Sequence, residues 1–263
     1  MVTSHDSTSP RDHLLITGTS GSIGAALARA LRRRHEGARL TLLDVHEAPS
    51  RALAETLGGD VHVVACDLSS SAAVPAALDD ARARFGPVHG LVNCAGFMEV
   101  RRFERLLWER AEALLSVDLV SPLRLMHACV PDMLASGRGF VVNVASMAGK
   151  VTLPGCAFYC AAKSGLAMAS EIARRELASQ GVRVVTVYPG AVESPLEAHA
   201  KDQYGRSAIT ALVPTGKPDV LARKIIEALD ADRPRVIYPS AYAVGMLAIA
   251  GPIALRIGPD PAD

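Results

Sequence analysis

The chain has 263 residues, of which 49% are hydrophobic and 21% are charged, and its formal net charge is +1. This composition supplies enough apolar material for a large core, and α/β sheets of this size are commonly single units. A net charge so close to zero gives no electrostatic basis for binding nucleic acid. The five cysteines have no metal-ligand spacing that a nearby His or Cys would complete, so we expect no metal site and a reducing, cytoplasmic compartment.

Along the chain, apolar runs typical of buried strands alternate with segments of helical periodicity. Residues 1–11 precede this pattern and are rich in Ser and Thr, and we expect them to form a disordered tail. The alternation from 12 to 240 predicts a single α/β domain with about seven parallel strands and helices on both faces. The predicted strands are 13–17, 39–43, 61–65, 88–92, 139–144, 182–187 and 235–238. The predicted helices are 22–34, 49–57, 70–85, 103–135, 155–179 and 217–230.

A glycine-rich turn follows the first predicted strand. It reads Thr17-Gly18-Thr19-Ser20-Gly21-Ser22-Ile23-Gly24 and leads directly into a helical run. A strand, a glycine-rich turn and a helix together aim backbone N–H groups and the positive end of the helix at a pyrophosphate. We therefore expect the segment from Gly18 to Gly24 to bind a dinucleotide.

The second predicted strand is followed by an acid, Asp44, twenty positions after Gly24. A carboxylate at this point can accept hydrogen bonds from the adenosine ribose, and it would repel a 2′-phosphate. The sequence therefore predicts NAD as the cofactor and makes NADP less favoured.

The segment Tyr159-Cys160-Ala161-Ala162-Lys163 places a phenol and an ammonium one helical turn apart, on one face of a predicted helix. The charge of Lys163 favours the phenolate and should lower the pKa of Tyr159. Ser146 lies thirteen positions before Tyr159, just past a buried strand, where its hydroxyl can bind the same substrate oxygen. These groups can move a proton on or off an alcohol or ketone oxygen.

In their order and spacing, these motifs resemble those of short-chain dehydrogenases/reductases, and the match spans about residues 12–240. The resemblance implies one Rossmann-type domain, a nicotinamide cofactor, Tyr159 as general acid/base and assembly into a homodimer or homotetramer. The residues that carry it are Thr17 to Gly24, Asp67, Asn93-Cys94-Ala95-Gly96, Ser146, Tyr159, Lys163 and Pro189-Gly190.

The resemblance also implies roles for the residues around these motifs. Lys163 would hold the nicotinamide ribose, and Ser146 would polarise the substrate oxygen. The remaining expected cofactor contacts are Asp67 and Leu68 at the adenine end, Asn93, Ala95 and Gly96 beside the cofactor, and Pro189, Gly190, Val192 and Ser194 at the nicotinamide amide. Asp67 is also suited to begin the following helix as an N-cap.

Two positions depart from the family pattern. Ser22 occupies the middle glycine site of the usual turn, and Gly21 comes one residue early, where it could supply a positive φ. Asp118 stands where the family usually has a catalytic Asn. Its charge should stabilise Lys163 as ammonium while partly cancelling the pull of Lys163 on Tyr159, which would move the pH optimum upward. The alternative is that Asp118 only helps to solvate the proton path.

Two segments near the C-terminal end have their own expected roles. Residues 191–216 show no clear period and follow a strand end, and we interpret them as a mobile substrate lid; a plain surface connection is the alternative. The stretch 236–257 is almost uncharged, and 241–263 is expected to be an apolar extension. Packing over the pocket or a subunit partner, peripheral contact with a bilayer, and a membrane span remain open for it.

The activity expected from these features is hydride transfer between NAD(H) and a secondary alcohol or ketone. A hydrophobic substrate is predicted, because apolar residues flank the motifs; they are Phe97, Met98, Val151, Leu153 and Pro154. Two alternatives remain: an NADP-dependent reductase of ketoacyl thioesters, and a scaffold that senses the cofactor without turnover. Asp44 argues against the first, and the intact Ser146, Tyr159 and Lys163 argue against the second.

Overall fold

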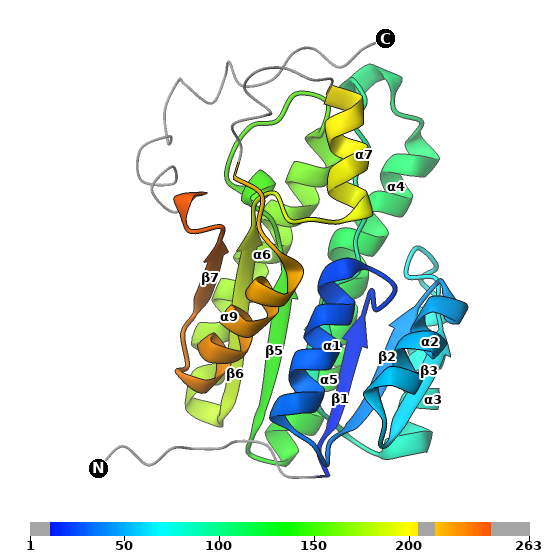
Figure 1. The fold of residues 1–263 in the computed structure, drawn as a ribbon, viewed down its shortest axis with the longest axis vertical. Coiled ribbons are helices and arrows are strands. Elements are labelled where there is room, and N and C mark those ends of the chain that lie inside the picture. Colours follow the sequence, from blue (N-terminus) through cyan, green and yellow to red (C-terminus); the bar gives the residue numbers. More distant parts are fainter. Residues whose placement is uncertain (1–10, 205–213, 243–263) are drawn as a thin grey trace.

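The computed structural model describes residues 11–204 and 214–242. At its centre is a parallel sheet of seven strands in the order β3-β2-β1-β4-β5-β6-β7 (Figure 1). The strand order reverses between β1 and β4, and in such sheets the carboxyl ends of the strands open a crevice for ligands at that point. The strands are β1 His13–Thr17, β2 Arg39–Asp44, β3 Val61–Ala65, β4 Val88–Asn93, β5 Gly139–Val144, β6 Val182–Pro189 and β7 Arg235–Tyr238.

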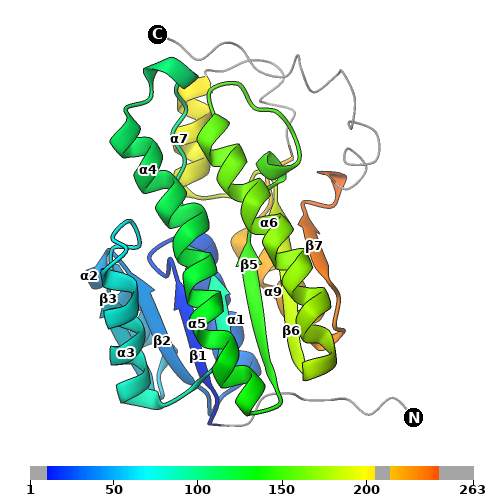
Figure 2. The same cartoon turned by 180° about the vertical axis from the view of Figure 1, so that it is seen from behind.

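Helices cover both faces of the sheet, as the alternating pattern predicted. One face carries α1 (Ser22–Arg34), α2 (Glu47–Leu57) and α9 (Pro218–Asp230), and the other carries α3 (Ala73–Phe85), α5 (Ser121–Ala135) and α6 (Ala157–Leu177) (Figures 1 and 2). The central strands β1 and β5 are buried along their whole length. Parallel strands buried on both faces show this uninterrupted apolar pattern, so the prediction of a doubly wound α/β domain is confirmed.

The predicted helix 103–135 is not continuous. It divides into a 3₁₀ turn at Phe103–Arg105, α4 (Trp108–Leu115), a π-helical turn at Ser116–Val120, and α5. A π turn inserts one residue into the helical ladder, and such turns are frequent at functional sites. The inserted turn contains Asp118, whose side chain is buried and forms an ion pair with Lys163 of α6.

The segment 191–216 contains a helix that the sequence pattern did not predict. This helix, α7, spans Pro195–Tyr204 and lies above the carboxyl edge of the sheet (Figure 1). Its start is stabilised locally, because the Ser194 hydroxyl accepts a hydrogen bond from the Glu197 N–H at 3.1 Å. Gln203, near its end, accepts a hydrogen bond through Oε1 from the Val100 N–H at 3.1 Å. The lid prediction for 191–216 falls partly outside the described residues.

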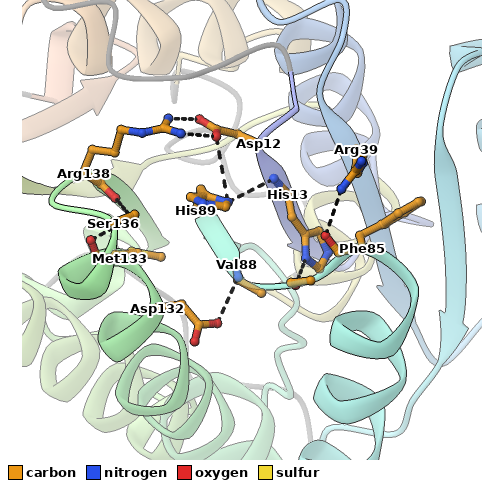
Figure 3. Close-up of polar contacts among 11 residues, drawn as sticks. Asp12, His13, Arg39, Phe85, Val88, His89, Asp132, Met133, Ser136 and Arg138 are labelled. Carbon is orange, nitrogen blue, oxygen red and sulfur yellow. Dashed lines mark hydrogen bonds and ion pairs between the residues drawn. The ribbon is translucent and has the colours of Figure 1, made fainter.

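At the opposite edge of the sheet, a polar cluster ties together the beginnings of β1, β4 and β5 (Figure 3). Asp12, just before β1, is almost fully buried and forms an ion pair with Arg138, just before β5. The N–H of His13 donates to His89 Nδ1 of β4 at 3.3 Å. These contacts join strands that are far apart in sequence. They all lie at the amino-terminal ends of the strands, opposite the carboxyl ends.

One helical run among the described residues, Trp108–Ala135 with a mean hydropathy of 1.4, is long and apolar enough to cross a membrane. A single run of this kind is weak evidence for a span, since core helices share these properties. Here α5 packs against β4, and its buried residues include Leu125, Cys129 and Met133. The C-terminal stretch that was considered for bilayer contact lies, from residue 243 on, outside the described residues.

Candidate active site

A cavity of about 740 Å³ runs along the carboxyl edge of the sheet. It extends from the glycine-rich turn and the end of β2, across the ends of β4 and β5, to the start of α7. The predicted site residues that line it are Gly18, Ser20 to Gly24, Asp44, Asp67, Leu68, Ala95, Gly96, Asp118, Ser146, Tyr159, Lys163, Pro189, Gly190, Val192 and Ser194. Three features that were predicted separately from the sequence therefore line one cavity. They are the glycine-rich turn, Asp44 after β2, and the pair of Tyr159 and Lys163.

Tyr159 and Lys163 project from the first two turns of α6, and Ser146 lies just beyond the end of β5. Tyr159 is buried, with 8% of its surface exposed. The Lys163 Nζ donates to the Val144 carbonyl at 3.2 Å and lies 5.8 Å from the centre of the Tyr159 ring. The Ser146 Oγ accepts from the Ala148 N–H at 3.0 Å, so a short turn holds the hydroxyl in place.

The pKa of Tyr159 is raised, because burial disfavours the phenolate more than its neighbours favour it. Lys163 lowers this pKa, as the sequence predicted, and a hydrogen bond with Ser146 also lowers it. The expectation of a net lowering is therefore wrong for the free protein. Asp118 contributes in the opposite direction, since its negative charge raises the pKa of Tyr159.

Asp118 forms a fully buried ion pair with Lys163, with 2.8 Å between its Oδ1 and the ammonium nitrogen. Its Oδ2 accepts a hydrogen bond from the Phe97 N–H at 3.2 Å. Burial alone would lower the pKa of Lys163, but Asp118 and Tyr159 outweigh it and raise the pKa, so Lys163 stays an ammonium. Burial raises the pKa of Asp118, and the ammonium opposes this.

Gly96 leaves room for this ion pair. A Cβ at Gly96 would lie 2.4 Å from the Asp118 Oδ1 and 3.1 Å from the Lys163 Nζ. The sequence interpretation placed Gly96 beside the cofactor, and Gly96 does line the cavity; within the protein, the missing side chain also leaves room for the Asp118 carboxylate. An exchange of Gly96 for any other residue would push the Asp118 carboxylate away from Lys163.

In the glycine-rich turn, the positive φ belongs to Gly18, at 72°. Gly21 is the N-cap of α1 with a φ of −81°, and Ser22 begins the helix. The expectation that Gly21 supplies a positive φ in place of Ser22 is therefore wrong, because no residue after Gly18 in the turn has a positive φ. Serine is accommodated at position 22 for the same reason.

The start of α1 fits a phosphate. No side chain caps its first turn, so its N-terminal N–H groups are available to an anion. Gly24 lets this turn approach β1 closely, since a Cβ there would lie 2.1 Å from the Gly18 carbonyl oxygen. Thr19 does not line the cavity; it is buried, and its hydroxyl hydrogen-bonds to Ser50 Oγ at 2.8 Å.

Asp44 is held at the end of β2 by three donors. Its carboxylate accepts from the Ser20 N–H at 2.8 Å, the Ser20 hydroxyl at 2.9 Å and the His46 N–H at 2.8 Å. Asp67, also in the cavity wall, accepts from the Ser69 N–H at 2.8 Å. Among the described residues, no Arg or Lys lines the cavity between the glycine-rich turn and Asp67. This end of the cavity therefore offers carboxylates and no strong cation.

Asn93, which was expected to contact the cofactor, does not line the cavity. Its amide nitrogen donates to the Asn143 Oδ1 at 2.8 Å and to the Pro122 carbonyl at 3.1 Å, inside the sheet and away from the cavity. Thr17 also helps to shape the carboxyl edge of the sheet, a role that the sequence interpretation did not assign to its side chain. Its hydroxyl accepts from the N–H groups of Cys94 and Ala95 at 3.0 and 3.1 Å, and so fixes the segment after β4 against β1.

The catalytic end of the cavity includes side chains that sequence reasoning missed. Among the five apolar residues expected to contact substrate, Phe97 lines the cavity and the other four do not. Further wall residues come from α4 and the following π turn and from α7; they are Arg110, Ala113, Val117, Pro195, Leu196 and Glu197. Pro195, Leu196 and Glu197 belong to the segment 191–216 that was expected to form a lid, but they were not singled out. The positions of all six residues in the wall depend on how α4, the π turn and α7 pack.

The two strong cations that line the cavity among the described residues, Lys163 and Arg110, are both paired. Lys163 pairs with Asp118, and Arg110 pairs with Glu99 while its guanidinium lies 5.3 Å from the Phe97 ring centre. Among the described residues, no cluster of three His, Cys, Asp or Glu side chains is arranged to hold a metal ion. The cavity thus combines an uncapped helix start, an acid after β2 and the Ser146, Tyr159 and Lys163 side chains, with an apolar wall beside them.

Comparison with known proteins finds similar sequences and similar structures. Residues 12–205 match the family model described as short chain dehydrogenase. The chain is similar to D-threitol dehydrogenase of Mycolicibacterium smegmatis, with 36% identity over 214 residues that cover 79% of this chain and 82% of the relative.

Two solved structures are also similar, and each comparison covers 88% of this chain and 98% of the other. One is a 3-ketoacyl-(acyl-carrier-protein) reductase from Brucella melitensis complexed with NADH, with 26% identity and a TM-score of 0.75. The other is a metagenomic short-chain oxidoreductase in complex with NADP, with 31% identity and a TM-score of 0.71.

Proposed function

Because the chain belongs to the short-chain dehydrogenase family and is an oxidoreductase of that family, we propose that it transfers a hydride between NAD(H) and a hydrophobic secondary alcohol or ketone. The observation that carries this proposal is the meeting of Ser146, Tyr159 and Lys163 with the uncapped start of α1 in one cavity. The nicotinamide supplies the hydride, and the protein supplies position and proton transfer.

Tyr159 acts as the general acid/base. It takes the proton from the alcohol during oxidation and returns one to the ketone oxygen during reduction. Ser146 donates a hydrogen bond to the same oxygen, and the short turn that holds its Oγ keeps the hydroxyl next to Tyr159. Lys163 holds the nicotinamide ribose and stabilises the phenolate. The apolar wall, which includes Phe97, Val117 and Leu196, receives the rest of the substrate.

NAD is favoured over NADP by the adenine end of the cavity. Asp44 is held there by Ser20 and His46, and among the described residues no Arg or Lys faces it across the cavity. A 2′-phosphate would meet a fixed carboxylate without a cation to neutralise it. The alternative is an NADP-dependent reductase of ketoacyl thioesters. One similar structure is complexed with NADP, which supports the cofactor of this alternative, but the similar 3-ketoacyl-(acyl-carrier-protein) reductase is complexed with NADH. The carboxylates at this end of the cavity favour NAD.

The proposal is tested with the purified protein, NAD⁺ and a panel of secondary alcohols that includes cyclohexanol, with NADH absorbance as the signal. The Tyr159→Phe variant removes only the proton transfer, so kcat should fall by several orders of magnitude while NAD⁺ still binds in a fluorescence titration. More than about a tenth of the wild-type turnover in this variant would contradict the assignment of Tyr159. Wild-type protein that binds NAD⁺ but oxidises no alcohol and reduces no ketone would favour the scaffold alternative.

A further inference from the structure

The first turn of α7 brings a carboxylate, Glu197, into the wall of the cavity. Glu197 lines the cavity together with Pro195 and Leu196, and its side chain is only 20% exposed. The tie between Gln203 and the Val100 N–H holds α7 to the segment that follows Phe97. Glu197 is therefore held by secondary structure against the cavity and does not extend freely into solvent.

The charge of Glu197 is balanced within its own helix. Its Oε1 lies 3.3 Å from the Lys201 ammonium, one helical turn further on, and Lys201 also donates to the Thr215 hydroxyl at 3.1 Å. No hydrogen bond to the other carboxylate oxygen is found within the described residues. Partial burial raises the pKa of Glu197, while Lys201 opposes this shift. Because the Glu197 side chain is only partly buried, water can donate to this oxygen in the free protein, and a ligand hydroxyl that replaces the water can supply the donor.

The charges around the cavity indicate what kind of ligand group fits this carboxylate. Glu197 is paired with Lys201, so a cationic group on the substrate gains little net attraction there. Arg110 and Lys163 are likewise paired, which leaves no free strong cation in the described wall to attract an anionic substrate. A neutral hydroxyl group can donate to Glu197 without disturbing these pairs.

We propose that Glu197 binds a second hydroxyl group of the substrate, so that the preferred substrates are diols, or the corresponding hydroxyketones, with an apolar body. The first hydroxyl is placed at Ser146 and Tyr159, and the apolar body lies against Phe97, Val117 and Leu196. This inference rests on the proposed function. When the substrate fills the cavity and displaces water from Glu197, an analogue that lacks the second hydroxyl leaves the carboxylate without a donor, so the site discriminates against that analogue.

The test compares trans-cyclohexane-1,2-diol with cyclohexanol, which differ by one hydroxyl on the same apolar ring. The wild-type protein should show a kcat/KM for the diol at least about tenfold above that for the alcohol, as expected for a hydrogen bond to a charged group. The Glu197→Gln variant keeps the size of the side chain but replaces one acceptor oxygen by a donor. It should reduce the ratio of the two kcat/KM values by about tenfold.

Asp202→Asn is the matched control, because Asp202 is an exposed acid on the same helix and should leave the ratio unchanged. The KM for NAD⁺ is measured in each variant, since a change in that constant alone would assign Glu197 to the cofactor and overturn the inference. Equal kcat/KM values for diol and alcohol in the wild-type protein would also overturn it. Tyr159-dependent oxidation of cyclohexanol would then leave the proposed function standing, whereas no oxidation of either compound would refute that function itself.

Discussion

At the scale of single residues, Asp118 determines how strongly Lys163 acts on Tyr159. The two charges are 2.8 Å apart and buried, so the ammonium is partly neutralised before it can stabilise the phenolate. In the proposed reaction, Tyr159 accepts the proton of the alcohol as a phenolate, and its raised pKa means that the phenolate forms only at higher pH. The groups that shift this pKa include Lys163, Asp118, Ser146 and Cys156.

The Asp118→Asn variant should therefore move the acidic limb of the kcat/KM profile for alcohol oxidation to lower pH, because the contribution that raises the pKa of Tyr159 is removed. At pH 7 the oxidation rate should increase by about two- to tenfold. The variant leaves Lys163 with a weaker partner, so a lower thermal stability is expected as well. The measurement is kcat/KM across the pH range, and a profile that stays in place would show that Asp118 serves packing alone.

The second prediction at this scale concerns Asp44. The wild-type kcat/KM should favour NAD over NADP by roughly 30- to 1000-fold, and Asp44→Ser should reduce that preference by at least about tenfold. Asp44 also accepts two hydrogen bonds from Ser20, so the variant could act by loosening the turn. Ser20→Ala separates these effects, because it removes one hydrogen bond and keeps the charge. Equal loss of preference in both variants would assign the effect to the turn.

Residue types and spacing were sufficient to predict Tyr159, Lys163 and Asp44 as occupants of the ligand edge, since each belongs to a motif whose geometry is local. Asn93 shows the limit of that reasoning. Asn93 directly precedes the cavity-lining segment Cys94 to Gly96 in the chain. Because side chains alternate along a strand, its own side chain points toward Asn143 in the sheet interior. Glu197 and Arg110 were missed because they belong to helices whose position over the cavity depends on packing.

At the scale of secondary-structure elements, the junction of β1, the glycine-rich turn and α1 sets the position of the proposed phosphate site. Gly24→Ala should weaken NAD⁺ binding by about tenfold or more and destabilise the fold by about 1–3 kcal/mol, because the new methyl would overlap the Gly18 carbonyl. Gly21→Ala is the control, since Gly21 has a negative φ and a Cβ there would lie 3.3 Å from the same oxygen. Calorimetry of NAD⁺ binding and thermal melting measure both effects, and equal losses in the two variants would contradict this explanation.

Helix boundaries were predictable to within a few residues where a helix is regularly amphipathic, as in α1 and α9. The π turn around Asp118 was not predictable from periodicity, because one inserted residue hardly changes the apolar pattern of a long helical run. The helix α7 was missed for a different reason. Its sequence is polar and short, and its stability comes from the Ser194 cap and contacts such as Gln203 with Val100.

At the scale of the whole molecule, the alternation of apolar strands and amphipathic helices predicted the parallel sheet and its two helical layers. It did not predict the polar contacts that join the amino-terminal ends of the strands. There, the His13 ring is buried between strands, with Nδ1 2.9 Å from the Gly86 carbonyl and Nε2 2.8 Å from the Thr41 hydroxyl. Because a carbonyl only accepts, Nδ1 carries the hydrogen in the neutral ring and Nε2 accepts from Thr41. Assembly into a homo-oligomer stays a prediction.

The buried ring of His13 makes the stability of the protein depend on pH. The pKa of His13 is lowered from 6.5 to about 4, chiefly by burial; the charges of His89 and Arg39 also lower it, while the hydrogen bond to the Gly86 carbonyl and the charge of Asp132 oppose the shift. The unfolded chain therefore binds a proton at His13 in this range while the folded chain does not, so the free energy of unfolding should decrease as the pH falls from 6.5 to 4. The contribution of His13 to this loss should be about 2–3 kcal/mol.

The prediction is checked by urea denaturation of the wild-type protein and the His13→Gln variant at several pH values between 7.5 and 4.5, about the range over which the effect should develop. His13→Gln should be less stable at pH 7.5, since the hydrogen bonds to Gly86 and Thr41 are altered, but it should lose less stability as the pH falls. His127→Gln, at an exposed position of α5, should follow the wild-type curve. Parallel curves for the wild type and His13→Gln would show that other groups, such as the carboxylates, cause the acid sensitivity.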